Sequence, residues 1–202
     1  EEEAELVARH GGRWTHEDGL DLVGTALPAY ARALQDAGVV LPEDAIITCI
    51  SQRIIARQAR SARWQPGARE LVAALHASGV PQALVTSSYR NLTEPVLRDS
   101  HGAFTAVVPG DEVRHPKPDP EPYLVAAGRL HVDPAVCVVV EDSRVGVTAA
   151  LAAGAHVLAV ESAVQLPDDL RLSRTDSLAA VTVADLARIA SGEVLQLRAE
   201  PV

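Results

Sequence analysis

The residues best suited to chemistry are one lysine and a pair of neighbouring carboxylates. Lys117 is the only lysine in a chain of 202 residues, and arginine supplies the rest of its 18 basic side chains. It lies in a proline-rich loop, where its ammonium is a compact point charge that fits a small pocket better than a broad guanidinium does. Glu141 and Asp142 follow further along the chain. The alternative is a lone surface lysine in a proline loop.

The two acids end an apolar run, residues 135–140, that predicts a parallel strand buried on both faces. The carboxyl ends of such strands are where open α/β sheets bind their ligands. Two adjacent negative charges at that place need a cation or a raised pKa, and oxygen-liganded Mg²⁺ meets the need. The alternative makes Asp142 or Ser143 an ordinary helix N-cap and leaves Glu141 solvated.

Hydroxyl groups follow another predicted strand. Residues 83–85 are apolar and run into Thr86, Ser87 and Ser88. Because parallel strands end on one edge of a sheet, we expect these hydroxyls, Lys117 and the two acids to meet in one crevice. Such a set suits a phosphate dianion paired with a divalent metal. No Gly-x-Ser-x-Gly turn surrounds the serines, so they are better interpreted as phosphate-binding or helix-capping groups than as nucleophiles.

Further basic residues have weaker interpretations. Arg90 and His115 are expected to flank the crevice and are candidates for contact with substrate, although single residues of this kind are more often solvated. Four arginines along and beyond the last N-terminal helix are interpreted as a solvated face, the alternative being that one of them reaches a substrate anion: Arg53, Arg57, Arg60 and Arg63.

The chain divides into a helical part and an alternating part. Residues 1–62 read as helical throughout, with Thr15 and Asp18 forming a capping box. Residues 63–202 alternate strands with helices, which predicts an α/β fold with a doubly wound, Rossmann-like parallel sheet preceded by a helical cap. The expected strands lie at residues 83–85, 105–108, 136–140, 156–160 and 181–183.

Composition restricts the class of protein. With 48% hydrophobic residues the chain is globular. Its net charge of −9 argues against nucleic acid as a partner, and no apolar run is long enough to span a membrane. Cys49 and Cys137 lie in apolar runs and are interpreted as buried free thiols, which suits a cytoplasmic protein. The histidines show no zinc-ligand spacing. We expect a monomer or a weak homodimer.

These motifs together resemble the haloacid dehalogenase superfamily. The resemblance rests on the order strand–Thr86-Ser87-Ser88, then Lys117-Pro118-Asp119-Pro120, then Val-Val-Val-Glu141-Asp142-Ser143, and it extends over essentially the whole chain. It is closest to the branch that includes beta-phosphoglucomutase and phosphoglycolate phosphatase. The resemblance implies that Thr86 hydrogen-bonds the transferring phosphoryl group, that Lys117 neutralises its charge, and that Glu141 and Asp142 hold Mg²⁺ directly or through water.

The chain departs from the family pattern at its start. The family's first motif, a strand ending in Asp-x-Asp-Gly-Thr, carries the nucleophile and should precede the cap. Gly24-Thr25 has no such strand or paired aspartate before it. We therefore expect the natural protein to contain a further N-terminal segment that supplies this central strand and the nucleophilic aspartate.

The favoured function is a Mg²⁺-dependent phosphoric monoester hydrolase that acts on a small phosphorylated metabolite through an aspartyl-phosphate. A hydrolase is favoured over a phosphomutase because residues 24–27 offer no basic group for a second phosphate. A dehalogenase is disfavoured because halide displacement does not need the metal that paired acids suit. A catalytically inactive binding protein or truncated product remains the alternative of a different class.

Overall fold

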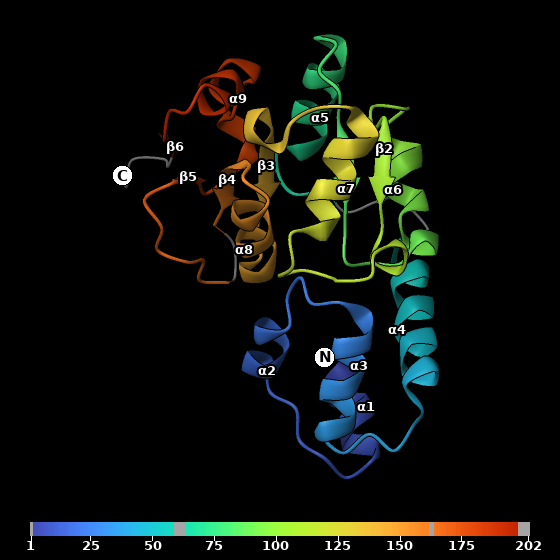
Figure 1. Ribbon diagram of the computed structural model, residues 1–202. Coiled ribbons are helices and arrows are strands. Elements are labelled where there is room, and N and C mark those ends of the chain that lie inside the picture. The colour runs from blue at the N-terminus through green and yellow to red at the C-terminus, as the bar shows by residue number, and fades with distance from the viewer. Residues whose placement is uncertain (1, 59–63, 162–163, 198–202) are drawn as a thin grey trace.

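The computed structural model describes residues 2–58, 64–161 and 164–197, and it consists of a helical layer set against an α/β part (Figure 1). The expected boundary at residue 62 lies outside the described residues. Residues 64–161 and 164–197 form the α/β part, and the first four helices form the helical layer. The cavities described below lie inside the helical layer and where it meets the α/β part.

The helical layer has a hydrophobic core of its own. Thr15 opens its second helix with the expected capping box, and Pro28 sits in the first turn of the third. Leu34 and Ile46 are fully buried between the third and fourth helices, and Leu92 of the α/β part packs against the same core. The helices are α1 (Glu2–Arg9), α2 (His16–Asp21), α3 (Leu27–Asp36) and α4 (Glu43–Gln58).

The α/β part alternates strands and helices as the sequence predicts, and every described strand pair is parallel. Its helices are α5 (Ala68–Ala77), α6 (Glu94–Asp99), α7 (Glu121–Leu130), α8 (Arg144–Ala152) and α9 (Val183–Ala190). Its strands are β1 (Ala83–Val85), β2 (Ala106–Val108), β3 (Val138–Glu141), β4 (His156–Val160), β5 (Leu172–Thr175) and β6 (Gln196–Leu197).

Side-chain alternation along β4 explains why helices cover both faces of the sheet. Leu158 and Val160 point into a core shared with α5 and α9, whereas Val157 and Ala159 point into a second core shared with α7 and α8. Successive side chains of a strand face opposite sides. The run is therefore apolar throughout because both of its faces are buried.

The strands form two hydrogen-bonded groups within the described residues. One group is β1-β2 and the other is β3-β4-β5-β6. Helix α7 packs on β1 and β2 and also against α8, which covers β3 and β4. The two groups are thus held side by side by helices, without a described strand pairing between β1 and β3.

Two predictions at the C-terminal side are wrong. Residues 181–183 are not a strand, because Thr182 caps α9 with a capping box and the helix begins at Val183. Strands β5 and β6 were not predicted. The β5 sequence reads Leu-Ser-Arg-Thr, yet Ser173 and Thr175 are buried, and their hydroxyls bond to Leu195 N and Ser177 O. Polar residues can occupy an inner strand when such bonds satisfy them.

The apolar run at residues 135–140 also differs from its prediction. Only its second half is in β3, and Val140 is 39% exposed while Val136, in a short 3-10 turn, is 62% exposed. Val138 and Val139 pack against the two different cores, but β3 is paired with β4 on one edge only within the described residues, so its valines stay partly exposed. Cys49 and Cys137, expected to be buried, are both partly exposed.

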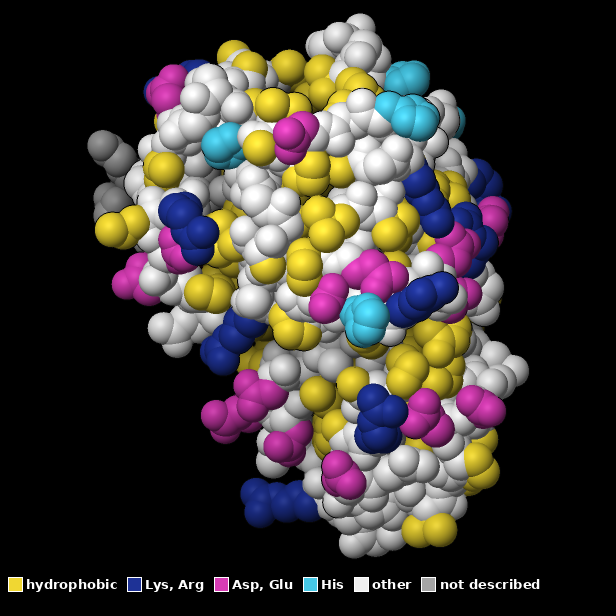
Figure 2. All heavy atoms as spheres, in the orientation of Figure 1, with side chains coloured by type: hydrophobic (Ala, Val, Ile, Leu, Met, Phe, Trp, Pro, Cys, Tyr) yellow, Lys and Arg dark blue, Asp and Glu magenta, His cyan; other side chains and the backbone are white. Residues whose placement is uncertain are grey.

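On the face shown in Figure 2, arginine and acidic side chains lie near one another, mostly along the right side and the lower half of the view, with hydrophobic and uncharged atoms between them. None of the helices in the described residues is long and apolar enough to cross a membrane.

Candidate active site

Lys117 lies between the ends of two strands that belong to different sheet groups. Its Nζ donates a hydrogen bond to the carbonyl of Val85 at 3.4 Å and forms an ion pair with Glu141. Only 6% of the Lys117 side chain and 10% of the Glu141 side chain are exposed. The loop before α7 therefore carries the one ammonium of the chain into the interior, at the carboxyl ends of β1 and β3.

Both carboxylate oxygens of Glu141 are fully occupied by donors. Oε1 accepts from Lys117 and from the Tyr123 hydroxyl at 2.7 Å, while Oε2 accepts from the backbone N–H of Asp142 and from both N–H and Oγ of Ser143. Burial by itself raises the pKa of Glu141, but the Lys117 charge and these hydrogen bonds outweigh burial and hold the pKa below its ordinary value. Glu141 is therefore an ionised anchor for Lys117, with donors on both of its carboxylate oxygens.

Gly146 explains how α8 accommodates this anchor. Ser143 is the N-cap of α8, and its Oγ accepts from the N–H of Gly146 at 3.0 Å. A Cβ added to Gly146 would overlap the Glu141 carboxylate. The glycine therefore lets the first turn of α8 approach the acid closely. The alternative interpretation of Ser143 as a helix cap is confirmed, and the same residue also lines the cavity described below.

Tyr123 belongs to the site, and sequence reasoning missed it. Its hydroxyl bonds to Glu141, and Lys117 Nζ lies 4.9 Å from its ring centroid, a cation–π distance. Burial, followed by the charge of Glu141, raises the pKa of Tyr123, so it stays protonated and donates. The sequence feature that could have indicated Tyr123 is its rarity, since the chain has only three tyrosines and this one follows Asp119-Pro120 in the first turn of a helix.

Asp142 differs from its neighbour. Burial, and then repulsion from Glu141, raises the pKa of Asp142, which means that its negative charge is poorly compensated by the described residues. Its carboxylate lines the cavity and is the candidate ligand for a cation there. Within the described residues, the one cluster of three metal-type side chains lies elsewhere, at His115, Asp119 and Glu121.

The hydroxyl residues after β1 have different tasks. Thr86 Oγ1 accepts from the N–H of Ser88 at 3.1 Å, which leaves the hydroxyl proton of Thr86 to be donated. Ser87 Oγ donates to the carbonyl of Gly24 at 2.6 Å, so it ties the helical layer to the strand end. Gly24 has φ of +81°, and a Cβ there would overlap Ser143. Neither serine is at an N-cap position, because Tyr89 and Thr93 are the N-cap residues of the next two helical segments.

These groups surround one cavity of about 250 Å³, which we call the strand-end cavity. Its lining comes from the end of β1 with residues 86–88, from Lys117, and from residues 141–143 at the end of β3. Gly24, Thr25 and Leu27 of the helical layer close it from the other side. Five hydroxyl residues, one ammonium and two carboxylates, of which Asp142 is poorly compensated, therefore line a single small volume.

Arg90 and His115 do not line this cavity. Arg90 forms an ion pair with Glu112, and its backbone N–H donates to Asp111. His115 is 70% exposed and its Nδ1 lies 2.7 Å from Glu121. Contact of these two residues with substrate stays a prediction. Both are held by carboxylates on the outer side of their loops.

Comparison with known proteins agrees with this geometry. Residues 4–154 match the family of haloacid dehalogenase-like hydrolases. The chain is 39% identical over 127 residues to hexitol phosphatase A of Escherichia coli, covering 58% of this chain and 56% of that protein. It is 33% identical over 166 residues to the bifunctional riboflavin kinase/FMN phosphatase of Arabidopsis thaliana, covering 77% of this chain and 42% of that protein.

A solved structure extends the likeness to the whole fold. The structure of CbbY from Rhodobacter sphaeroides in complex with phosphate superposes with a TM-score of 0.78 at 26% identity, covering 91% of this chain and 89% of that one. The chain belongs to the haloacid dehalogenase-like hydrolases. It spans about half the length of the curated relatives it matches.

Proposed function

We propose that this chain belongs to a Mg²⁺-dependent phosphatase that hydrolyses a small phosphorylated metabolite. The observation that carries the proposal is the buried Lys117–Glu141 pair beside the strand-end cavity, together with the Thr86 hydroxyl. A buried ion pair costs desolvation, so its presence at a cavity wall calls for a function. The relatives named above are phosphatases by name, which supports the same class of reaction.

The phosphoryl group lies in the strand-end cavity in this proposal. Lys117 neutralises the charge of its oxygens while Glu141 and Tyr123 hold the ammonium in place. Thr86 donates its hydroxyl proton to a phosphoryl oxygen. Positioned donors of this kind stabilise the charge that develops in phosphoryl transfer, since the barrier is lowered mainly by electrostatics and orientation.

Asp142 is the residue of this chain that fits a magnesium ion. Its carboxylate is an oxygen ligand of the type Mg²⁺ prefers, and its raised pKa is the mark of a charge that a cation would stabilise. The oxygens of Glu141 already accept five hydrogen bonds. In this proposal Glu141 therefore favours the bound cation through its nearby negative charge. Bound Mg²⁺ polarises the phosphoryl oxygens.

The nucleophile in this proposal is an aspartate on a segment that precedes residue 1. Within the described residues β1 and β3 each lack a strand partner on one edge. The same ammonium contacts residues at the ends of both strands. A parallel strand placed between them would pair both edges and would end at Lys117. The aspartate carboxylate at the end of that strand attacks phosphorus, the bond from phosphorus to the ester oxygen breaks, and the leaving oxygen takes up a proton to give the alcohol. Water then hydrolyses the aspartyl-phosphate to inorganic phosphate and the free carboxylate.

The helical layer acts as the cap in this proposal, over residues 1–62. A phosphomutase, which must bind a second phosphate under its cap, is the second candidate. Hydrolysis is favoured because Gly24, Thr25 and Leu27, which close the strand-end cavity, carry no positive charge. A protein that binds a phosphorylated ligand without turnover is the candidate of a different class.

The test is hydrolysis of p-nitrophenyl phosphate by the full-length natural protein, with Mg²⁺ and after chelation by EDTA. We expect turnover that is lost on chelation and restored by added Mg²⁺. Isomerisation of a sugar phosphate without release of inorganic phosphate would favour the mutase. Binding of inorganic phosphate without any turnover would favour the binding protein.

A further inference from the structure

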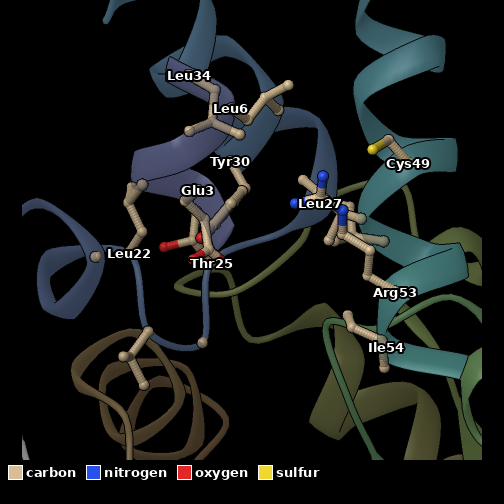
Figure 3. A pocket seen from close by; sticks show the side chains of 14 residues that line it. Glu3, Leu6, Leu22, Thr25, Leu27, Tyr30, Leu34, Cys49, Arg53 and Ile54 are labelled. Carbon is tan, nitrogen blue, oxygen red and sulfur yellow. The ribbon is translucent and has the colours of Figure 1, made fainter. Parts of the chain in front are cut away.

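A second cavity of about 310 Å³ lies inside the helical layer, and we call it the cap cavity (Figure 3). Most of its wall is aliphatic, contributed by α1, the 22–27 segment, α3 and α4. Six leucine and isoleucine side chains take part: Leu6, Leu22, Leu27, Leu34, Ile50 and Ile54. Its size is at the lower end of the range for small-molecule sites, so it can hold a compact organic group.

The cap cavity adjoins the strand-end cavity. Gly24, Thr25 and Leu27 line both of them. The hydrogen bond from Ser87 to Gly24 and the close approach of Gly24 to Ser143 fix this short segment against the ends of β1 and β3. A molecule with a phosphoryl group at Lys117 therefore has its remaining atoms beside residues 24–27, next to the cap cavity.

The charges in the cap cavity balance. Among its lining residues, one acid and one base carry formal charges, Glu3 from α1 and Arg53 from α4. Figure 3 shows both side chains directed into the cavity, with Glu3 close to Tyr30 and Thr25. Burial, and then Glu3, raises the pKa of Tyr30, so the phenol is neutral and donates to Glu3. The lining thus offers a hydrogen-bond acceptor and a hydrogen-bond donor to a ligand hydroxyl, and its formal charges sum to zero.

This balance selects against a charged occupant. A carboxylate or a second phosphate entering an aliphatic cavity gives up its hydration and meets Glu3 as well as Arg53. A neutral alcohol with one or two hydroxyls loses less hydration, and its carbon atoms bury against leucine and isoleucine. Of the four arginines interpreted as a solvated face, Arg53 lines this cavity, whereas Arg60 and Arg63 lie outside the described residues.

We propose that the cap cavity receives the alcohol half of the substrate, and that this half is neutral, partly apolar and bears a hydroxyl. The inference rests on the proposed phosphatase function and narrows its substrate class. Phosphomonoesters of uncharged hydroxylated alcohols are then substrates, whereas bisphosphates and phosphorylated carboxylic acids are excluded. Glu3 is the specificity residue that repels the second negative charge.

The test compares two aryl phosphates of similar size with a neutral or an anionic group at the same ring position, 4-(hydroxymethyl)phenyl phosphate and 4-carboxyphenyl phosphate. For the full-length protein we expect kcat/KM to be at least about tenfold higher for the neutral substrate. Glu3→Gln removes the repelling charge and should lower that preference severalfold. Glu5→Gln is the matched control, since Glu5 lies on the same helix, pairs with Arg9 and does not line the cavity.

A binding measurement tests the same preference without requiring turnover. Calorimetry with 4-hydroxybenzyl alcohol and with 4-hydroxybenzoate should show tighter binding of the alcohol, and Glu3→Gln should narrow the difference. Equal kcat/KM and equal binding for the two charge forms, with p-nitrophenyl phosphate still hydrolysed, would overturn this inference alone. No hydrolysis of any phosphomonoester would overturn the proposed function, and the binding measurement would then decide the inference.

Discussion

Strands β3 and β4 have similar sequences and different surroundings. β4 is hydrogen-bonded on both edges, and residues 157–160 are at most 8% exposed. β3 begins with three valines, yet it has one described strand partner, and Val140 is 39% exposed. β1 resembles β3 in this respect, with all three residues only partly buried. Apolar sequence made each of them a strand, and the number of neighbours decided how deeply each is buried.

The site groups lie at the ends of the half-paired strands. Thr86 follows β1, Glu141 ends β3, and Lys117 reaches both. The fully paired strand β4 is followed by Glu161, which forms an ion pair with Arg174 of β5, and its own side chains pack into the two cores. Open strand edges leave space for a further strand and a ligand, whereas a strand paired on both sides offers only its side chains to packing. The predictions below test this contrast.

The largest expected effect is on turnover at the half-paired strand ends. Lys117→Ala in the full-length protein should lower kcat by about 100- to 1,000-fold, because one preorganised charge at the phosphoryl group is lost. The measurement is p-nitrophenyl phosphate hydrolysis, with circular dichroism as the check on folding. Arg129→Ala, which removes a cation that bonds Val107 and Glu112 outside the strand-end cavity, is the control. Turnover unchanged by Lys117→Ala would contradict the assigned role.

Glu141→Gln tests the ion pair that joins the two strand ends. Leaving Lys117 buried without its partner should lower the free energy of unfolding by about 3–5 kcal/mol. Because the pKa of Glu141 is lowered by folding, its contribution is complete above its ordinary value of 4.5 and disappears as the pH falls through the lower folded value. Urea denaturation from pH 7 to pH 3 should therefore show wild type and variant converging only below about pH 4.5. A constant difference would contradict this.

Matched core substitutions test the contrast between the strands directly. Leu158→Ala in β4 should lower the free energy of unfolding by about 2–5 kcal/mol, because the side chain is fully buried. Val140→Ala in β3 should cost about 1 kcal/mol or less in residues 1–202, since much of that side chain is exposed. If a preceding segment adds a strand beside β3, the cost of Val140→Ala should rise in the longer protein. An unchanged cost there would count against a strand in that position.

Asp142→Asn tests the poorly compensated carboxylate at the end of β3. Because burial and Glu141 raise the pKa of Asp142, its ionised form destabilises the metal-free fold at neutral pH, and the amide should raise Tm slightly. The stabilisation of the full-length protein by Mg²⁺, about 2.7 kcal/mol at 100 times Kd for a single site, should be lost in the variant. Differential scanning calorimetry with and without Mg²⁺ measures both effects. Retained Mg²⁺ stabilisation would exclude Asp142 as a ligand.

Ser87→Ala has the smallest expected effect. It removes the hydrogen bond to Gly24 that joins the helical layer to β1, at a cost of about 1 kcal/mol. Hydrogen exchange should accelerate in residues 22–27 and stay unchanged in β4. Ser100→Ala, which removes a hydrogen bond to Leu97 within one turn, is the matched control. Equal exchange in the two variants would show that the bond does not hold the layers together.

Much of the fold could be predicted because its signals are local. Apolar β-branched runs predicted β1, β2, β3 and β4, and the glycine, proline and capping residues placed most helices. The convergence of Thr86, Lys117 and the acids followed from one topological rule, that parallel strands end on the same edge. The family resemblance rested on the same residues.

Other features depended on contacts between distant residues. Strand β5 has a polar sequence and is a strand because β4 and β6 lie on either side of it. Tyr123 belongs to the site because its hydroxyl donates a hydrogen bond to Glu141. Arg90 and His115 do not line the strand-end cavity and instead contact Glu112 and Glu121.

The sequence by itself determined which residue types end each strand, since backbone preference and apolar patterning act over a few neighbouring positions. Only the tertiary structure decided what each side chain does. The packing gives both carboxylate oxygens of Glu141 hydrogen-bond donors, whereas the negative charge of Asp142 is poorly compensated. It also places Arg53 and Glu3 in the lining of one cavity. Hydrogen-bond saturation and charge balance are set by packing between segments far apart in the chain, and no local pattern records them.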